Sequence, residues 1–285
     1  EVASIHAEMQ AIMKSVNYDG TLQEFFEFMR TDERFYFPQG PEGREEYLTL
    51  ARDIVAKMTA RLDEVFLTKP SIPLEVRPVE AYREKSAGKA FYSGGAPDGT
   101  RPGIFYANLA NMKDMPRFEL EALVYHEAIP GHHMQVAIAQ RLDTLPRTRR
   151  FSWYTAYGEG WGLYSEHLPK EMGFYSDPYS DFGRLAMRLW RACRLVVDTG
   201  IHHRKWTREK AIEYLMQNTA ASKGQSLKAI ERYFVMPGQA TAYMIGMLKI
   251  LELREKARAA LGEKFDIRVF HELVLTNGPV PLPIM

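Results

Sequence analysis

The sequence YHEAIPGHHMQ, residues 125–135, decides how the rest of the chain is interpreted. Apolar residues recur at helical spacing in residues 120–128, which lead into this stretch, and they predict a helix there. Pro130 cannot donate to the hydrogen-bond ladder of a helix, and Gly131 tolerates the distortion that follows a proline. We therefore expect a helix with a bulge at this Pro-Gly pair.

Three of the eight histidines of the chain lie in this stretch, and a glutamate follows the first of them. In a His-Glu-x-x-His motif, two histidines one helical turn apart bind zinc and the glutamate acts as general base. The spacing here is longer, since His132 and His133 follow His126 by six and seven residues. On an unbroken helix six residues turn by about 600°, and seven separate two rings by roughly 10 Å along the axis. A bulge of two residues between Glu127 and Gly131 would bring His132 to the position of the second ligand, and a bulge of three would bring His133 there.

We favour His132 as the second ligand, with Glu127 as the catalytic base and His133 as a further catalytic candidate. The alternative is a helix terminus whose histidines make only structural hydrogen bonds. The single cysteine, Cys193, excludes a metal site built from thiolates. A metal in this protein must therefore be held by nitrogen and oxygen atoms.

A third ligand is expected in YGEGWGLYSE, residues 157–166, which also has a helical pattern. Glu159 lies between two glycines, which let another backbone approach closely. Glu166 follows seven residues later on the same helix face, where its carboxylate could orient a ligand histidine or could simply be exposed. We expect one Zn²⁺ ion, held by His126, His132 and Glu159.

Two later segments supply candidates for substrate contact. VDTGIHH, residues 197–203, places histidines at the end of a long predicted helix, where they could instead interact with the helix dipole. ERYFVMPGQATAY, residues 231–243, holds an arginine that could clamp a carboxylate and tyrosines that could stabilise an oxyanion, although these residue types are also common in packing and on surfaces. The candidates are His202, Arg232 and Tyr233 for substrate binding and Tyr243 for catalysis.

The rest of the chain predicts a mainly α, multi-helical fold in a single domain. Residues 1–70 have helical periodicity, and residues 111–285 continue as one helix after another. Between them, residues 71–110 contain three short segments of alternating or aromatic character, separated by Gly and Pro turns. We expect these segments to form a small antiparallel sheet inserted before the metal-binding helix. They are residues 74–79, 89–93 and 103–108.

The composition sets limits on function. The 285 residues are 46% hydrophobic and 26% charged, which is typical of a globular protein. Thirty-seven basic residues against thirty-six acidic ones leave a net charge of +1, which argues against a general nucleic-acid binder. No apolar run is long enough for a membrane span. No targeting signal is visible and the chain opens inside a helical pattern, so we expect a missing N-terminal region and leave cytoplasmic and secreted or periplasmic locations open.

Four motifs in order, HEAIPGHHMQ, YGEGWGLYSE, VDTGIHHRKW and RYFVMPGQATAY, resemble the bacterial domain of unknown function 885 family. The resemblance runs from about Leu74 to the C-terminus. That family is regarded as metallopeptidase-like and related in logic to the helical zinc carboxypeptidases and oligopeptidases. The resemblance implies a helical fold with a cleft lined by the metal helix, and it supports His126, Glu127, His132 and Glu159 as the centre. Because members are nearly twice this length, it also implies that the chain is a C-terminal half that associates with an N-terminal half.

These observations favour a zinc-dependent hydrolase of peptide bonds that acts on short peptides. The metal would lower the pKa of its bound water to about 7, and Glu127 would pass the proton to the leaving amine. Residues 103–108, GIFYAN, could hold an extended peptide by strand addition, or could be an ordinary sheet strand. Two alternatives stay open: metal-dependent hydrolysis of a non-peptide amide or ester, and a binding or scaffold protein with a vestigial metal site.

Overall fold

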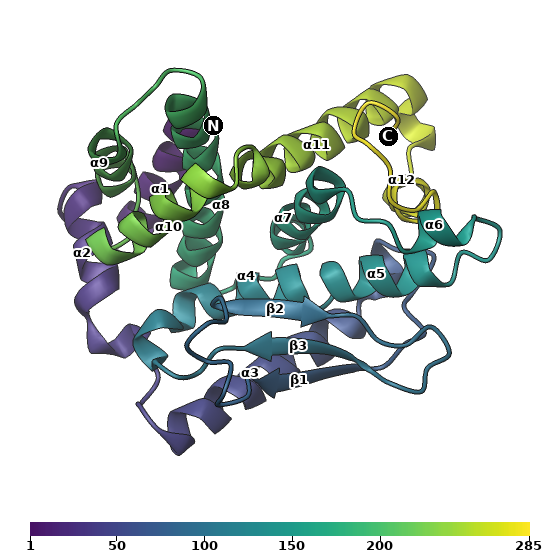
Figure 1. Ribbon diagram of the computed structural model, residues 1–285, viewed down its shortest axis with the longest axis horizontal. Coiled ribbons are helices and arrows are strands. Elements are labelled where there is room, and N and C mark those ends of the chain that lie inside the picture. Colours follow the sequence, from purple (N-terminus) through teal and green to yellow (C-terminus); the bar gives the residue numbers. More distant parts are fainter.

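Helices make up most of the chain, and a small sheet separates the third helix from the fourth (Figure 1). The computed structural model describes residues 1–285. The fold is mainly α, as the sequence predicts, and no helix is both long and apolar enough to cross a membrane. The α-helices are α1 (Val2–Ser15), α2 (Leu22–Thr31), α3 (Pro41–Thr59), α4 (Arg117–Glu127), α5 (His132–Gln140), α6 (Arg147–Arg150), α7 (Thr155–Glu171), α8 (Pro178–His202), α9 (Arg208–Asn218), α10 (Lys223–Val235), α11 (Ala242–Leu261) and α12 (Ile267–Thr276).

Local sequence signals explain several of the helix boundaries. The hydroxyl of Thr207 accepts a hydrogen bond from the Lys210 amide, so Thr207 caps the N-terminus of α9. Helix α3 begins at Pro41, whose missing N–H costs nothing in a first helical turn. The helical periodicity of residues 1–70 forms three α-helices, the last of which ends at Thr59.

The sheet contains strands β1 (Leu74–Pro78), β2 (Ala90–Ser93) and β3 (Gly103–Ala107). Their order is β1-β3-β2, with β3 parallel to β1 and antiparallel to β2. The prediction of an antiparallel sheet is therefore wrong for one of the two strand pairs. Turn signals indicate where strands end but not which strands pair. Here the last strand enters between the first two, so it reverses direction relative to β2 and runs along β1.

The sheet lies directly against the helices that carry the histidines. Strand β3 is buried along its whole length. Helix α3 packs against β1, whereas α4 and α5 pack against the other two strands. In Figure 1 the latter two helices run along the β2 side of the sheet. The edge strand β2 is consequently next to the segment YHEAIPGHHMQ.

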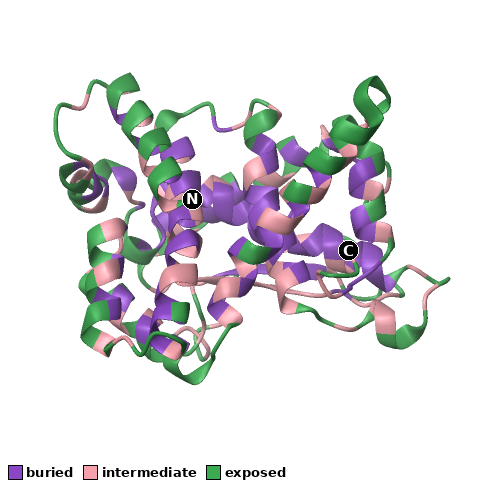
Figure 2. Cartoon of the chain, turned by 90° about the horizontal axis from the view of Figure 1, so that it is seen from above, coloured by how far each residue is buried: buried purple, intermediate pink, exposed green.

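One hydrophobic core joins the helical segments on both sides of the sheet. Its main cluster of 58 buried residues extends from Ile5 to Val280, and Figure 2 shows buried residues gathered in the middle of the molecule. Helices α7 and α11 approach closely because both have glycine at their crossing point. A Cβ on Gly160 would overlap the backbone of Gly246, and a Cβ on Gly246 would overlap the carbonyl oxygen of Ala156. This contact fixes α7, which carries the third predicted ligand.

Candidate metal centre

The helix that carries the histidines is interrupted where the sequence predicts. Helix α4 ends at Glu127, and α5 begins directly after Gly131. A Cβ on Gly131 would overlap the carbonyl oxygen of His126, so only glycine fits at this position. The indole N–H of Trp161 on α7 donates a hydrogen bond of 2.9 Å to the carbonyl oxygen of Pro130. The interruption is therefore held by both its own backbone and the neighbouring helix.

This interruption brings His126 and His132 together with Glu159 of α7. The Nε2 atom of His126 lies 3.5 Å from Oε2 of Glu159, and the Nε2 atom of His132 lies 3.4 Å from the same oxygen. The two imidazole rings are 4.7 Å apart between centroids and nearly perpendicular. One ligand atom from each of the three side chains lies within 4.8 Å of the others. The structure thus brings together the three side chains that the sequence analysis selects as ligands.

The distances in this cluster suit a zinc ion. In a tetrahedral site with Zn–N and Zn–O bonds of 2.0–2.1 Å, neighbouring ligand atoms are roughly 3.3–3.4 Å apart. The two distances from Glu159 to the histidines are close to this value. Two imidazoles and one carboxylate form a ligand set used by catalytic zinc sites, which keep the fourth position open. His126, His132 and Glu159 therefore fit one ion by both chemistry and geometry.

A second carboxylate on α7 orients His126. Oε1 of Glu166 lies 2.7 Å from Nδ1 of His126, so this carboxylate fixes the ring with Nε2 directed at the cluster. The Glu166 side chain also lies 3.6 Å from an Nη atom of Arg191 on α8. A Cβ on Gly162 would contact the His126 ring at 2.7 Å, so the ring lies against the α7 backbone. Glu166 is therefore a buried partner of a ligand histidine rather than an exposed acid.

The electrostatics of the cluster favour positive charge. Burial by itself would lower the pKa of His126, but hydrogen bonds to the carboxylates of Glu159 and Glu166 raise it to about 10. Burial would raise the pKa of Glu159, but hydrogen bonds to His126 and His132 keep it well below its usual value. The cluster stabilises a cation between its carboxylates, whether that cation is a protonated imidazole or a metal ion.

The cluster lies in the wall of a cavity of about 950 Å³. Glu127 also lines this cavity and is only 8% exposed. The ring of Tyr243, on α11, stacks on His126 with 6.2 Å between centroids, and Trp153 packs its edge against His132 at 5.7 Å. The cavity wall includes further aromatic rings and also strand β2. Strand β2 contributes Ala90, Phe91 and Tyr92, and α8 contributes Trp190.

His133 does not join the cluster. Its Nδ1 lies 3.1 Å from the hydroxyl of Tyr92, and its ring packs edge-on against the Tyr92 ring. Burial lowers the pKa of His133 to about 4, so the ring is neutral at pH 7. It lies between α5 and the sheet, next to Gly103, and does not line the cavity. The bulge thus turns His132, and not His133, toward His126.

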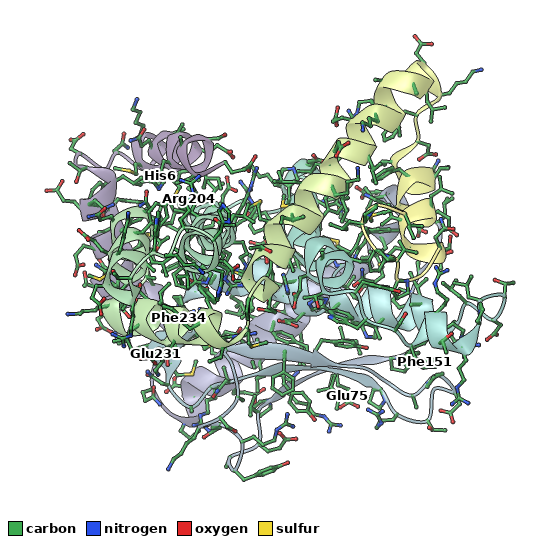
Figure 3. The ribbon with its side chains drawn as sticks, turned by 45° about the horizontal axis from the view of Figure 1, so that its top comes forward. His6, Glu75, Phe151, Arg204, Glu231 and Phe234 are labelled. Atoms are coloured by element: carbon green, nitrogen blue, oxygen red, sulfur yellow. The ribbon has the colours of Figure 1, made fainter.

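Only one of the three predicted substrate-binding residues lines the cavity. His202 donates from Nε2 to the carbonyl oxygen of Tyr233 at 2.8 Å, and neither residue lines the cavity. This contact joins the end of α8 to α10, which is a structural role. Arg232 does line the cavity but is exposed, with an Nη atom 3.4 Å from the side-chain oxygen of Gln239. Figure 3 shows this part of α10, marked by Phe234, on the opposite side of the molecule from Phe151.

One face of α8 lines the cavity, although the sequence gives no reason to expect it there. Met187, Trp190, Arg191 and Arg194 all contribute to the wall. They are spaced by three, four and seven residues, which places them on one helix face. That spacing is visible in the sequence, but a mixture of apolar and basic residues on a helix is common. Nothing in the sequence alone connects this face to the histidines.

The family follows from comparison with known proteins. A family model described as "Bacterial protein of unknown function (DUF885)" matches residues 1–285. The chain belongs to this family. The match begins well before Leu74, from which the four motifs indicate the resemblance. No curated protein matches the chain.

Two solved structures are similar to this member of the DUF885 family. One, "the putative lipoprotein from Colwellia psychrerythraea", is 44% identical with a TM-score of 0.96, and the match covers 99% of this chain and 49% of that one. The other, "a putative lipoprotein of unknown function from Shewanella oneidensis", is 21% identical with a TM-score of 0.81, and the match covers 99% of this chain and 53% of that one. The second supports the fold alone. The chain spans about half the length of both proteins.

Proposed function

We propose that this chain carries the catalytic centre of a zinc-dependent hydrolase that cleaves peptide bonds in short peptides. The observation that supports the proposal best is the convergence of His126, His132 and Glu159 in the wall of a large cavity that Glu127 also lines. Because the family description names no activity, the support is geometric and chemical. A general base beside the first ligand favours a catalytic site over a vestigial one, which would have no use for that base.

Each residue has a defined task in the proposed reaction. His126, His132 and Glu159 would hold the zinc ion, which when bound supplies a Lewis acid and an acidified water. Glu127 would accept a proton from the attacking water and deliver it to the leaving amine. Burial raises the pKa of Tyr243, and the negative charge of Glu159 raises it further. Its hydroxyl therefore keeps its proton at pH 7 and can donate to an oxyanion.

The edge of the sheet favours a peptide over a non-peptide amide or ester. Strand β3, which we expect to accept a peptide, is paired on both sides and has no free edge. Strand β2 has one. The Lys89 carbonyl accepts a hydrogen bond from the Asn108 amide, so the main-chain groups of Lys89 face β3. Because this direction alternates from one residue to the next along an antiparallel strand, the main-chain groups of Ala90 and Tyr92 point away from β3. An extended peptide beside β2 in the cavity could bond to these groups.

The cell envelope is the proposed location. The similar structure from Colwellia psychrerythraea is described as that of a putative lipoprotein, which suits the secreted or periplasmic alternative. Association with an N-terminal half, which the resemblance implies, stays a prediction.

Metal content and turnover test the proposed function together. We expect about one zinc ion per chain in the wild type and none in His126→Ala, measured by elemental analysis of protein purified without added metal. The zinc-loaded wild type should release amino groups from a mixture of short peptides, and His126→Ala should not. Absence of zinc, even after titration with zinc, would refute the metal centre; zinc without cleavage of any peptide would refute the peptidase assignment.

A further inference from the structure

One partly buried arginine in the cavity wall has no carboxylate partner. Arg194 lies on the cavity-lining face of α8, no carboxylate pairs with it, and its Nε atom is buried without a hydrogen-bond partner. Asp198, one helical turn further on, is not paired with Arg194, because its carboxylate accepts from the Gly238 amide at 3.1 Å instead. A partly buried arginine without a counter-ion carries a desolvation cost that no partner offsets. Arg194 is therefore suited to an anion that the protein itself does not provide.

The other cations around the cavity differ from Arg194. Three of them are neutralised by nearby glutamates, and a fourth, Arg191, lies 3.6 Å from Glu166 of the metal centre. Arg232 has no carboxylate partner either, but it is exposed to water, where an unpaired charge costs little. The three neutralised pairs are Arg30–Glu27, Lys89–Glu119 and Lys113–Glu33. Among these cations, Arg194 alone is partly buried, with its Nε atom enclosed, and has no carboxylate partner.

Aromatic rings fix the position of the Arg194 side chain. Its guanidinium carbon lies 4.7 Å from the ring centroid of Tyr243, 5.8 Å from that of Tyr233 and 5.9 Å from that of Trp190. Arginine is attracted to such ring faces, and a side chain held in this way loses little freedom on binding a ligand. Tyr233, which we expect to contact substrate, contacts Arg194 instead. The cation is thus held in place before any ligand arrives.

The guanidinium also lies at a useful distance from the metal centre. Tyr243 has Arg194 at one side and stacks on His126 with 6.2 Å between ring centroids. The cation is therefore separated from a ligand histidine by a single aromatic ring. The guanidinium carbon and the His126 ring centroid are therefore at most about 11 Å apart. The contact of a carboxylate with the guanidinium and the bonds at the metal take up part of this distance, and one or two extended residues, at about 3.3–3.6 Å each, span the remainder.

We propose that Arg194 binds the C-terminal carboxylate of a peptide whose scissile bond lies at the centre formed by His126, His132 and Glu159. This inference rests on the proposed function and makes the protein an exopeptidase that releases one or two C-terminal residues. Water adds its oxygen to the scissile carbonyl carbon, the C–N bond breaks, and a proton passes to the leaving nitrogen. The leaving residue keeps its own carboxylate on Arg194. Arg232, which we expect to clamp this carboxylate, lies at the exposed rim.

Matched peptides that differ only in their C-terminal group test the inference. The probes are N-acetyl-Ala-Phe-Leu with a free carboxylate, the same peptide as its C-terminal amide, and the amide of N-acetyl-Ala-Phe-Glu. For the zinc-loaded wild type we expect kcat/KM on the free acid to exceed that on both amides by about 10- to 100-fold, since a hydrogen bond to a charged group contributes that much. Equal cleavage of all three would overturn the inference. Rapid cleavage of the glutamate amide alone would also overturn it, because the anion would then be a side chain.

Variants connect this preference to one residue. Arg194→Gln should retain zinc and lose the preference for the free acid, whereas Arg194→Lys should recover part of it, because lysine keeps the charge without the bidentate geometry. Arg232→Gln is the matched control and should keep the preference. A preference that survives in Arg194→Gln, or disappears in Arg232→Gln, would contradict the assignment.

Binding separates failure of the inference from failure of the proposed function. If the zinc-loaded protein cleaves none of the probes, the peptidase proposal fails, and calorimetry of the same probes then decides the role of Arg194. Tighter binding of the free acid than of its amide in the wild type, but not in Arg194→Gln, would support the carboxylate site. Equal affinity for the acid and the amide would refute it.

Discussion

Helix α7 contacts a buried histidine on each of two faces, and the two have opposite electrostatic surroundings. His126 is 3% exposed and lies between the carboxylates of Glu159 and Glu166. His271 is completely buried and lies against the hydroxyl of Tyr164, on the same helix. Burial is thus nearly the same at the two sites, while the neighbouring charges differ.

The partners of each ring decide what it can do. The Val65 carbonyl oxygen can only accept, so Nδ1 of His271 donates to it at 2.8 Å and Nε2 accepts from the Tyr164 hydroxyl at 2.8 Å. Burial lowers the pKa of His271 to about 4, and the ring stacks on Phe66 as part of the core. Neither nitrogen of this ring is free for a metal. In His126, by contrast, Nε2 is directed at the carboxylate of Glu159. The neighbouring charges and the direction of the ring, and not burial, therefore distinguish the candidate site.

Of all the changes considered, replacing His132 on α5 by alanine should have the largest effect. We expect His132→Ala to lose its zinc and all activity, because it removes one of three ligands. His133→Ala is the matched control and should retain zinc, because its ring contacts Tyr92 and not the cluster. Elemental analysis of both variants measures this difference. Zinc loss in His133→Ala with zinc retained in His132→Ala would show that His133, and not His132, is the second ligand.

Replacing Glu127 by Gln tests whether the candidate site is catalytic without removing a metal ligand. We expect full zinc content and a fall in kcat of about 10²- to 10⁴-fold, which is the usual contribution of a general base. Initial rates with a short peptide, beside metal analysis of the same sample, measure both quantities. Undiminished kcat in Glu127→Gln would remove this carboxylate from the proposed reaction.

Glu166→Gln tests whether the carboxylate that orients His126 strengthens zinc binding. Its hydrogen bond to Nδ1 orients His126, so we expect zinc to bind about 10- to 100-fold more weakly. Glu171→Gln is the matched control, because Glu171 pairs with Arg254 on the other side of α7 and should leave zinc affinity unchanged. Competition with a metal chelator measures the affinities. Similar affinities for the two variants would mean that Glu166 acts only in packing.

Much of the fold could be predicted from the sequence because its signals are local. Apolar periodicity, capping residues such as Thr207 and the Pro-Gly break at residues 130–131 each act within a few residues, and the structure has helices and a break at these places. Strand pairing is not local. Strand β3 lies between its two neighbours and packs against α5, and no turn signal encodes these contacts between distant segments.

The candidate site divides in the same way. Helix geometry requires a bulge that brings His132 or His133 toward His126, and it places Glu159 and Glu166 on one helix face, so sequence reasoning reaches these candidates. The cavity-lining role of Arg194 depends on where α8 packs in three dimensions. His202 shows the reverse error, since its position at a helix end suggested substrate contact and the fold turned it toward α10.

His271 supplies the smallest effect, and it acts on stability rather than activity. Its pKa of about 4 in the folded protein lies below the ordinary value of 6.5 expected in the unfolded chain. Above pH 6.5 both states hold a neutral ring and the group has no effect. As the pH falls from 6.5 toward 4, the unfolded chain binds a proton that the folded chain excludes, so stability is lost. We expect this to cost about 2 kcal/mol between pH 7 and pH 5.

Urea unfolding at pH 7 and pH 5 measures this loss, and His271→Gln isolates it. The variant will be less stable at both pH values, because it disrupts the contacts with Tyr164 and Val65. Its stability should nevertheless change less between the two pH values than that of the wild type, by about 2 kcal/mol, because glutamine does not titrate. All other groups titrate in both proteins, so the difference between their pH dependences belongs to His271. Equal pH dependence would mean that this ring accepts a proton in the folded state, and the contrast between the two faces of α7 would no longer hold.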